Sequence, residues 1–526
     1  MNARQGLKQP LHYFLNSIPG RLWLFGWVLT LLILPTPQAP ISDSRSRMLE
    51  AHWIWSGADP GGALIGRDGA HHFWFGLGQI LIFLPVDWTV DHLGLHSTAL
   101  RVLAITYLVF PVINGGVLAL GFLVLRELGF CSRTALISTL SLQFLTTLLW
   151  HFQNNQENPL ILLLALVTVI ALLRWHRTNV RSWLHLAAAA QSFALMIRIP
   201  NLAIAGALFL LPLVLTVLNS QSNLRQNLRA AFIQSRQIIS ACIPWLLLAI
   251  IADRWWQWYR FGSLTTTYMD GYAVWMRTQT NDVAPGFPFH NPFWDGILGQ
   301  LFSPAKSIFV YEPLWFPGLV ILWLGRKRWP AAVTALALCA SLALVGSMIG
   351  MARFCLWHSD PNWGPRYLAT PAHLLELPAG ALIYHWIRSR WARVVIWLAT
   401  GILAIVGVSS LYFVAYHELK LDPKKPYAFA QTGWREGVWV GGNADFRFLN
   451  RPFLIVTDYR HELNRTAAWT ASPPLRLLFP FQPLQSLRPE FRWSLRTVWV
   501  AVALTLFLII RKTLQRASRE DGQWLS

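Results

Sequence analysis

The polar stretch ISDSRSRMLEAHWIWSG, residues 41–57, lies between two apolar segments, and the rest of the chain is interpreted around it. An aromatic, glycine-rich run follows, HHFWFGLGQILIFLPVDW, residues 71–88. The whole region, about 40–98, is too polar to cross a bilayer. We therefore predict a long loop here, containing a helix that begins near Asp43 and covers about 44–55.

Composition places the flanking segments in a membrane. Of the 526 residues, 54% are hydrophobic and only 13% are charged, which is about half the charged share of a soluble domain. Apolar runs of about 18 residues or more recur along the chain, as transmembrane helices require. The sequence predicts an all-α polytopic membrane protein with about twelve transmembrane helices and a long first extracytoplasmic loop.

The basic residues predict how the chain is oriented. The net charge of +20 is concentrated in short connections between apolar runs. Such clusters mark the cytoplasmic ends of spans and attract anionic lipids, so we do not predict nucleic-acid binding. Their alternation along the chain places both termini in the cytoplasm. It places the loops at about 37–98, 259–307 and 351–370 outside.

The same pattern predicts three parts of the chain. Residues 1–415 form a transmembrane core with the outer loops. Residues 416–492 are polar and rich in Pro, Gly and aromatics, which indicates an extracytoplasmic segment or a small domain. Residues 493–526 form a last transmembrane helix and a basic cytoplasmic tail.

The predicted outer face carries the unusual polar residues, within a few residues of span ends. Charges there are costly and are usually paired or functional. Arg and Lys could hold an anionic phosphate, each contact contributing about 1.5–3 kcal/mol. A carboxylate could take the proton of an attacking hydroxyl or amine. The set comprises Asp43, Glu50, Glu157, Arg198, Asp253, Arg260, Lys306, His358, Asp360 and Arg366.

Five of these residues also have a structural explanation. Asp43 could cap the helix that it begins, and Glu157 could be a solvated cap before the next span. Arg198, Lys306 and Arg366 could anchor at the interface, with their charged ends reaching water. From spacing alone, these explanations compete with the functional ones.

The sequence indicates no certain cofactor and leaves a divalent metal open. His71, His72 and Asp68 could suggest an ion site, but adjacent histidines seldom converge on one ion. The four cysteines show no paired spacing, so neither a disulfide framework nor a zinc motif is indicated. No residue is therefore predicted as a metal ligand.

Several segments, taken in order, resemble motifs of the GT-C superfamily of membrane glycosyltransferases. The resemblance is strongest to the bacterial branch related to protein O-mannosyltransferases and the lipid A aminoarabinose transferase. Asp43, eight residues before Ala51, resembles the acidic residue of the first outer loop. FGLGQILIFLP, residues 75–85, resembles the helix that follows. The later matches are QENPLILLL (156–164), MIRIPNLAI (196–204), WYRFGS (258–263), GQLFSPAKSIFVYEP (299–313) and WGPRYL (363–368).

The resemblance implies an inverting glycosyltransferase of the bacterial inner (plasma) membrane. It would move a sugar from a polyprenyl-phosphate donor to an extracytoplasmic lipid, glycan or protein. Asp43 would be the general base, and Glu157 would support it or help to place the acceptor. The residues that would bind the donor phosphate are Arg198, Lys306 and Arg366. The residues that would line the substrate pocket are Trp74, Tyr311, His358 and Tyr367.

Two other functions stay open on the sequence. A transporter or flippase of a lipid-linked sugar would have similar spans and basic outer residues. It would not need Asp43 as a proton acceptor, and it would show an internal repeat, which the two halves of the sequence do not. A polysaccharide ligase or polymerase would depend on outer Arg and His residues, with His358 among them and Asp43 dispensable.

Overall fold

The computed structural model describes most of the chain before residue 411 and a long C-terminal helix. The described residues are 16–33, 42–153, 156–219, 224–279, 287–303, 306–325, 328–355, 357, 364–386, 390–410, 433–435, 438–440 and 489–525. His358 and Asp360 lie outside them. Of the predicted outer segment 416–492, the described part is two short strands and the first turn of the last helix.

Helices dominate the described structure, as predicted. The bundle contains α2 (Ile18–Ile33), α5 (Thr98–Leu108), α6 (Phe110–Glu127), α7 (Ser132–Leu145), α8 (Leu148–Gln153), α9 (Asn158–Thr178), α10 (Arg181–Ile197), the 3-10 helix η1 (Ile199–Asn201), α11 (Leu202–Phe209), α12 (Leu211–Asn219), α13 (Leu224–Phe261), α17 (Trp315–Leu324), α18 (Ala331–Ala352), α19 (Ala369–Trp386), α20 (Arg390–Ser409) and α24 (Pro489–Leu525).

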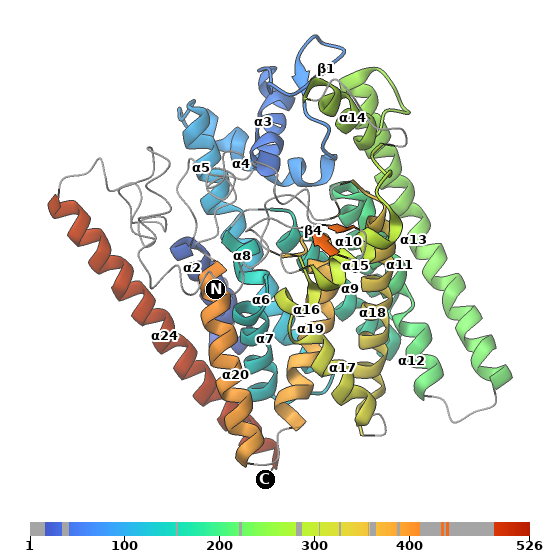
Figure 1. Cartoon of the computed structure of the whole chain (residues 1–526), viewed down its shortest axis with the longest axis vertical. Coiled ribbons are helices and arrows are strands. Elements are labelled where there is room, and N and C mark those ends of the chain that lie inside the picture. Colours follow the sequence, from blue (N-terminus) through green and yellow to red (C-terminus); the bar gives the residue numbers. More distant parts are fainter. Residues whose placement is uncertain are drawn as a thin grey trace, which may run out of the picture.

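The connecting elements are shorter. They are α3 (Ser42–Ser56), β1 (Leu64–Ile65), β2 (His71–His72), α4 (Leu77–His92), α14 (Tyr268–Gln279), α15 (Phe293–Phe302), α16 (Ile308–Tyr311), β3 (Gly433–Arg435) and β4 (Val438–Val440). β1 pairs with β2 and β3 with β4, each pair antiparallel. Figure 1 shows α3, α4, α14 and β1 together at one end of the bundle.

Six of the described helical segments are long and apolar enough to cross a membrane. They are Thr98–Glu127, Asn158–Thr178, Ile199–Asn219, Arg229–Phe261, Ala331–Ala352 and Thr497–Asp521. Shorter apolar helical stretches are Ile18–Ile33, Trp315–Leu324 and Trp391–Ile405. The predicted helical class is confirmed, and the count of about twelve spans stays a prediction.

Close approach of helix backbones holds the centre of the bundle together. α2 packs along α6, and a Cβ on Gly26 would lie 2.8 Å from the Cα of Gly115, so both positions need glycine. Beside this contact, Asn114 donates from Nδ2 to Thr30 Oγ1 at 3.0 Å. Small residues and interhelical hydrogen bonds are the usual means of helix association in lipid.

The two ends of α9 differ in charge. Its 21 residues span about 30 Å, the thickness of a hydrocarbon core. Near its C-terminal end, Arg174 and Arg177 pair with Glu127 at 2.9 and 2.5 Å. Glu157 directly precedes its N-terminal end. The basic connections and Glu157 therefore lie at opposite ends of a membrane-length helix.

The first predicted loop contains the predicted helix. α3 covers Ser42–Ser56 and holds Asp43 in its first turn. The two adjacent histidines of β2 have different partners: His71 Nδ1 lies 3.0 Å from Asp59 Oδ2, and His72 Nδ1 lies 3.2 Å from Glu50 Oε2. His72 also lies 3.2 Å from Asp68 Oδ1 through its Nε2.

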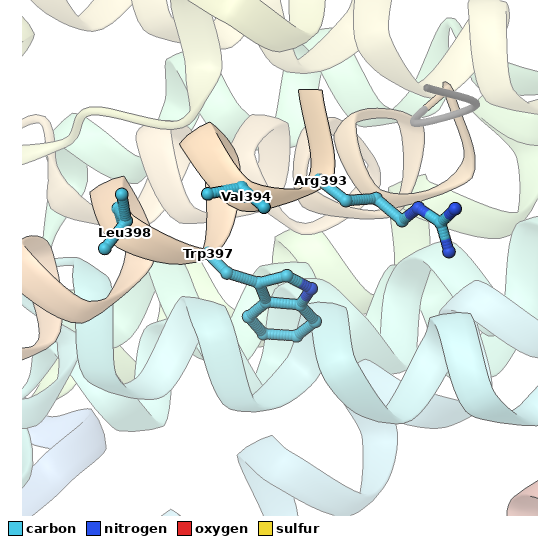
Figure 2. Close-up of a pocket in the computed structure, with 4 residues that line it drawn as sticks. All are labelled: Arg393, Val394, Trp397 and Leu398. Carbon is cyan, nitrogen blue, oxygen red and sulfur yellow. The ribbon is translucent and has the colours of Figure 1, made fainter. Parts of the chain in front are cut away.

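A surface hollow of about 590 Å³ lies on α20. Figure 2 shows four described side chains that line it, Arg393, Val394, Trp397 and Leu398, all of which belong to this helix. Trp397 and Leu398 are 50% and 64% exposed. None of the predicted site residues that the structure describes lines this hollow, so we do not treat it as a candidate site.

Candidate functional site

Four of the predicted residues meet in one ionic cluster. The Arg366 guanidinium donates from Nη2 to Asp43 Oδ2 at 2.7 Å and to Glu157 Oε1 at 2.8 Å. Arg198 donates from Nη1 to the same Glu157 oxygen at 3.0 Å. The cluster joins the start of α3, the start of α9, the end of α10 and the turn before α19.

Arg47 is a fifth member, which the sequence pattern did not identify. It donates from Nη1 to Glu157 Oε2 at 3.0 Å, and its guanidinium lies 4.3 Å from the centre of the Phe75 ring. Arg47 follows Asp43 by four residues, so both lie on one face of α3. That spacing is the sequence signal that could have pointed to it.

Local backbone features place the cluster residues. Glu157 precedes the first turn of α9, where the helix dipole favours an anion. Arg198 has extended backbone between α10 and η1, and Pro200 follows it, which prevents α10 from continuing. Arg366 follows Gly364, whose φ of +72° suits glycine. A Cβ on Gly364 would also lie 2.8 Å from Thr147 Cγ2.

The two carboxylates have different electrostatic environments. Glu157 is fully buried. Burial by itself would raise the pKa of its carboxyl, but three guanidinium groups, Arg366 foremost, hold that pKa well below the ordinary 4.5. Glu157 is therefore ionised and is a poor proton acceptor. The Asp43 side chain is 26% exposed, so it is the carboxylate of the cluster that an incoming molecule can reach.

The buried positions rule out solvent-facing roles for two of the predicted residues. Glu157 is not a solvated cap, because it is buried and its side chain makes no capping hydrogen bond. Lys306 does not reach to water, because it is 1% exposed. Its Nζ donates to the carbonyl oxygen of Gly364 at 3.5 Å, two residues before Arg366. Lys306 thus lies next to the cluster, against the turn that carries Arg366.

The predicted aromatic residues lie around the cluster. The Arg198 guanidinium lies 4.5 Å from the centre of the Tyr367 ring. Tyr311 is buried and lies against Gly364. Trp74 packs in an aromatic cluster that also contains Tyr272 and Tyr367. The fourth predicted pocket residue, the histidine at 358, lies outside the described residues.

Other members of the outer polar set lie apart from this cluster. Glu50 and Arg260 are both fully buried, and their charged atoms lie 3.5 Å apart. Asp253 pairs with its neighbour Arg254 at 2.5 Å. These pairs connect α13 with the first loop or stay within α13, so we assign them structural roles.

The cluster gathers basic side chains around two carboxylates. Among the described residues, Arg47, Arg198 and Arg366 pair with Asp43 and Glu157, and Lys306 lies beside them. Among the described residues, the buried Nε atoms of Arg47 and Arg366 have no hydrogen-bond partner. Buried donors of this kind call for an acceptor, and an oxyanion such as a phosphate would supply one.

Comparison with known proteins adds one distant likeness. The sequence matches no protein-family model and no curated protein. The chain is similar to a solved structure of the archaeal oligosaccharyltransferase AglB from Archaeoglobus fulgidus, in complex with an inhibitory peptide and a dolichol-phosphate. The TM-score is 0.44 and the identity is 13%, over 77% of this chain. This chain spans 57% of the length of that protein.

Proposed function

We propose that this protein is an inverting membrane glycosyltransferase of the GT-C type. It would move a sugar from a polyprenyl-phosphate donor to an acceptor on the extracytoplasmic face of the bacterial inner membrane. The observation that carries the proposal is the ionic chain from Asp43 through Arg366 to Glu157. It combines a reachable carboxylate with buried cations at the end of a membrane-length helix.

Asp43 is the proposed general base. It is the more exposed carboxylate of the cluster, and its partner Arg366 orients it. We assign Glu157 a different role, because as a buried anion it positions the guanidinium groups of Arg47, Arg198 and Arg366. A carboxylate tied to three guanidinium groups gains little from taking a proton, so the two acids are not interchangeable.

The proposed phosphate site uses the basic side chains gathered around Glu157. Arg198, Lys306 and Arg366 would bind the donor phosphate, and Arg47 is added to this group because its Nε is buried without a partner among the described residues. Fixed cations in a water-poor site stabilise the negative charge that develops on the leaving phosphate. The aromatic side chains of Trp74 and Tyr367 would cover the sugar.

The proposed reaction is a single displacement at the anomeric carbon. The acceptor hydroxyl or amine gives its proton to the Asp43 carboxylate as its oxygen or nitrogen bonds to the sugar C1. The bond between C1 and the phosphate oxygen breaks, and the phosphate leaves with the electron pair. Attack from the face opposite the phosphate inverts the configuration at C1.

Asp43→Asn tests the base. Asparagine keeps the shape and can still accept a hydrogen bond from Arg366, but it cannot take a proton at neutral pH. We expect transfer to fall by about 10²–10⁴-fold, with donor binding nearly unchanged. The assay reconstitutes the full chain in liposomes with labelled polyprenyl-phosphate hexoses and pentoses, and uses a total envelope extract as the source of acceptors.

Two further variants make this test selective. Asp59→Asn is the matched control, because Asp59 is a half-exposed carboxylate of the same loop, bonded to His71 and apart from the cluster; it should transfer normally. Lys306→Met should weaken donor binding more than acceptor binding. Normal transfer by Asp43→Asn would rule out Asp43 as the base and favour a ligase or polymerase that does not depend on it. No transfer by the wild type, with any donor, would favour a transporter.

A further inference from the structure

We propose that Glu312, His373 and Glu376 form a binding site for one divalent cation of the zinc type. One ligand atom from each of the three side chains lies within 4.8 Å of the other two. All three side chains are at most 1% exposed. This site is separate from the cluster around Glu157 and shares no residue with it.

Helix geometry brings the three side chains together. His373 and Glu376 are three residues apart on α19, so they project from the same face of the helix. Glu312 directly follows α16 and lies opposite that face, with its Oε1 3.2 Å from His373 Nε2. A histidine and a glutamate three apart on an inward helix face are a recurrent source of metal ligands in helix bundles.

The hydrogen bonds of the site leave one carboxylate oxygen unsatisfied. Glu376 Oε1 accepts from the backbone N–H of Leu314 at 3.0 Å, but Glu376 Oε2 is buried and has no partner among the described residues. Glu312 has a further hydrogen-bond donor, because the Thr147 hydroxyl donates to its Oε1. A buried oxygen without a donor costs free energy, and a cation beside it would remove that cost.

The charge balance of the site also calls for a cation. Two carboxylates lie side by side, and among the described residues their one ion-pair partner is the His373 imidazole, 3.2 Å from Glu312 Oε1, which is a cation only when it is protonated. Glu157, by contrast, is surrounded by three arginines. Two buried carboxylates so close together require a shared proton or a positive ion between them.

The donor set selects the kind of cation. Carboxylate oxygens and imidazole nitrogens are both zinc ligands, and three protein ligands leave a position for a fourth. Tetrahedral ligands at about 2.0–2.2 Å from zinc lie about 3.4 Å from one another, so small side-chain rotations would close the present spacing. The His151 ring, 6.1 Å from that of His373 between centroids, lies at the edge of the site.

A cation bound here would also stabilise the arrangement of the neighbouring cluster around Glu157. Glu312 is part of the segment that carries Lys306, and α19 begins three residues after Arg366. Thr147, which donates to Glu312, also lies against Gly364 in the turn before Arg366. Cation binding would therefore fix the two proposed phosphate-binding residues relative to each other. This consequence rests on the proposed function, whereas the cation site itself does not.

The test measures metal content without any glycosyl donor. The full chain is purified with an affinity tag that binds no metal, and elemental analysis by mass spectrometry gives its bound metals. It is then stripped with a chelator and titrated with zinc against a chromophoric chelator. We expect about one tightly held zinc per chain, lost in Glu376→Gln and in His373→Gln. Zinc should also raise the unfolding temperature of the wild type.

Glu50→Gln is the matched control. Glu50 is also fully buried and lies beside a histidine, His72. Unlike Glu376, its carboxylate accepts a hydrogen bond from the Phe73 backbone N–H and pairs with Arg260. This variant should keep the zinc. The proposal would be overturned if the wild type and Glu376→Gln bound equal amounts of zinc. It would also be overturned if the wild type neither held zinc nor was stabilised by it. A proton shared between the two carboxylates would then be the remaining explanation. Should the variants fail to fold, the wild-type titration still decides. Loss of transfer in Asp43→Asn with zinc retained would separate the two proposals.

Discussion

Glu157→Gln should destabilise the protein more than any other single carboxylate-to-amide change in the ionic cluster. Three guanidinium groups converge on Glu157, at 3.0 Å from Arg47, 3.0 Å from Arg198 and 2.8 Å from Arg366. Glutamine keeps the size of the side chain and removes its charge. The change therefore tests whether that charge holds α3, α9, α10 and the turn before α19 together.

The size of the expected loss in stability follows from the partners that each arginine keeps in Glu157→Gln. Arg366 keeps its bond to Asp43. Arg198 is 18% exposed, so its loss is limited to about 0–1 kcal/mol, as for a partly solvated pair. Arg47 is 2% exposed and has no other carboxylate partner among the described residues. Leaving a buried charge without its partner costs about 3–5 kcal/mol, and we expect a total near this range.

The assay is reversible unfolding by SDS in mixed micelles, followed by tryptophan fluorescence. Adding Arg47→Gln to Glu157→Gln should recover part of the loss, with a coupling energy of about 0.5–3 kcal/mol. Glu127→Gln is the matched control, because Glu127 also pairs with two arginines, but these are 39% and 51% exposed. It should cost about 0–1 kcal/mol.

One result would refute this reasoning. If Glu157→Gln cost no more than Glu127→Gln and the double variant showed no coupling with Arg47, the charge of Glu157 would not organise the cluster. The two proposed roles, Glu157 as the anion that positions the arginines and Asp43 as the base, would then have no energetic support.

Two further predictions concern stability. The pKa of Glu157 lies well below the ordinary 4.5, so its ionic contribution should be constant above about pH 4.5 and be lost as the pH falls toward the folded-state pKa. The difference in unfolding midpoint between wild type and Glu157→Gln should therefore be the same at pH 8 and pH 6 and should narrow at pH 4; a constant difference at pH 4 would contradict this. Gly364→Ala should cost about 1–3 kcal/mol, because φ is +72° and the added Cβ meets side chains within 3.0 Å. Gly350→Ala, on a helix with open space around it, should be neutral or stabilising by up to about 1 kcal/mol in the same unfolding assay, and equal effects of the two substitutions would count against the predicted strain.

The helical class of the protein follows from local properties of the sequence. Apolar length, the share of charged residues and the positions of basic clusters each depend on neighbours along the chain. The start of α3 near Asp43 is local in the same sense, because it follows from a polar first turn after an apolar segment. Predictions of this kind need no knowledge of which helix packs on which.

The proximity of Asp43, Glu157, Arg198 and Arg366 is not a local property. Their motifs suggested a common site only through the resemblance, since the bond between Arg366 and Asp43 joins positions 323 residues apart. Arg47 shows most clearly what the sequence cannot predict. In the sequence it is one basic residue of a polar helix, and only the packing of α3 places it against Glu157, 110 residues away.

Sequence alone thus determined the helical class and which polar residues stand near the ends of the predicted spans, because hydrophobic length and charge act along the chain. Tertiary structure decided which of those residues share a cluster, because ion pairs between helices depend on packing and on the direction of each side chain. The grouping of Glu312 with His373 and Glu376 is of the second kind. His373 and Glu376 lie on α19, and only the tertiary structure places Glu312, which follows α16, beside them, so that two buried carboxylates and an imidazole lie side by side.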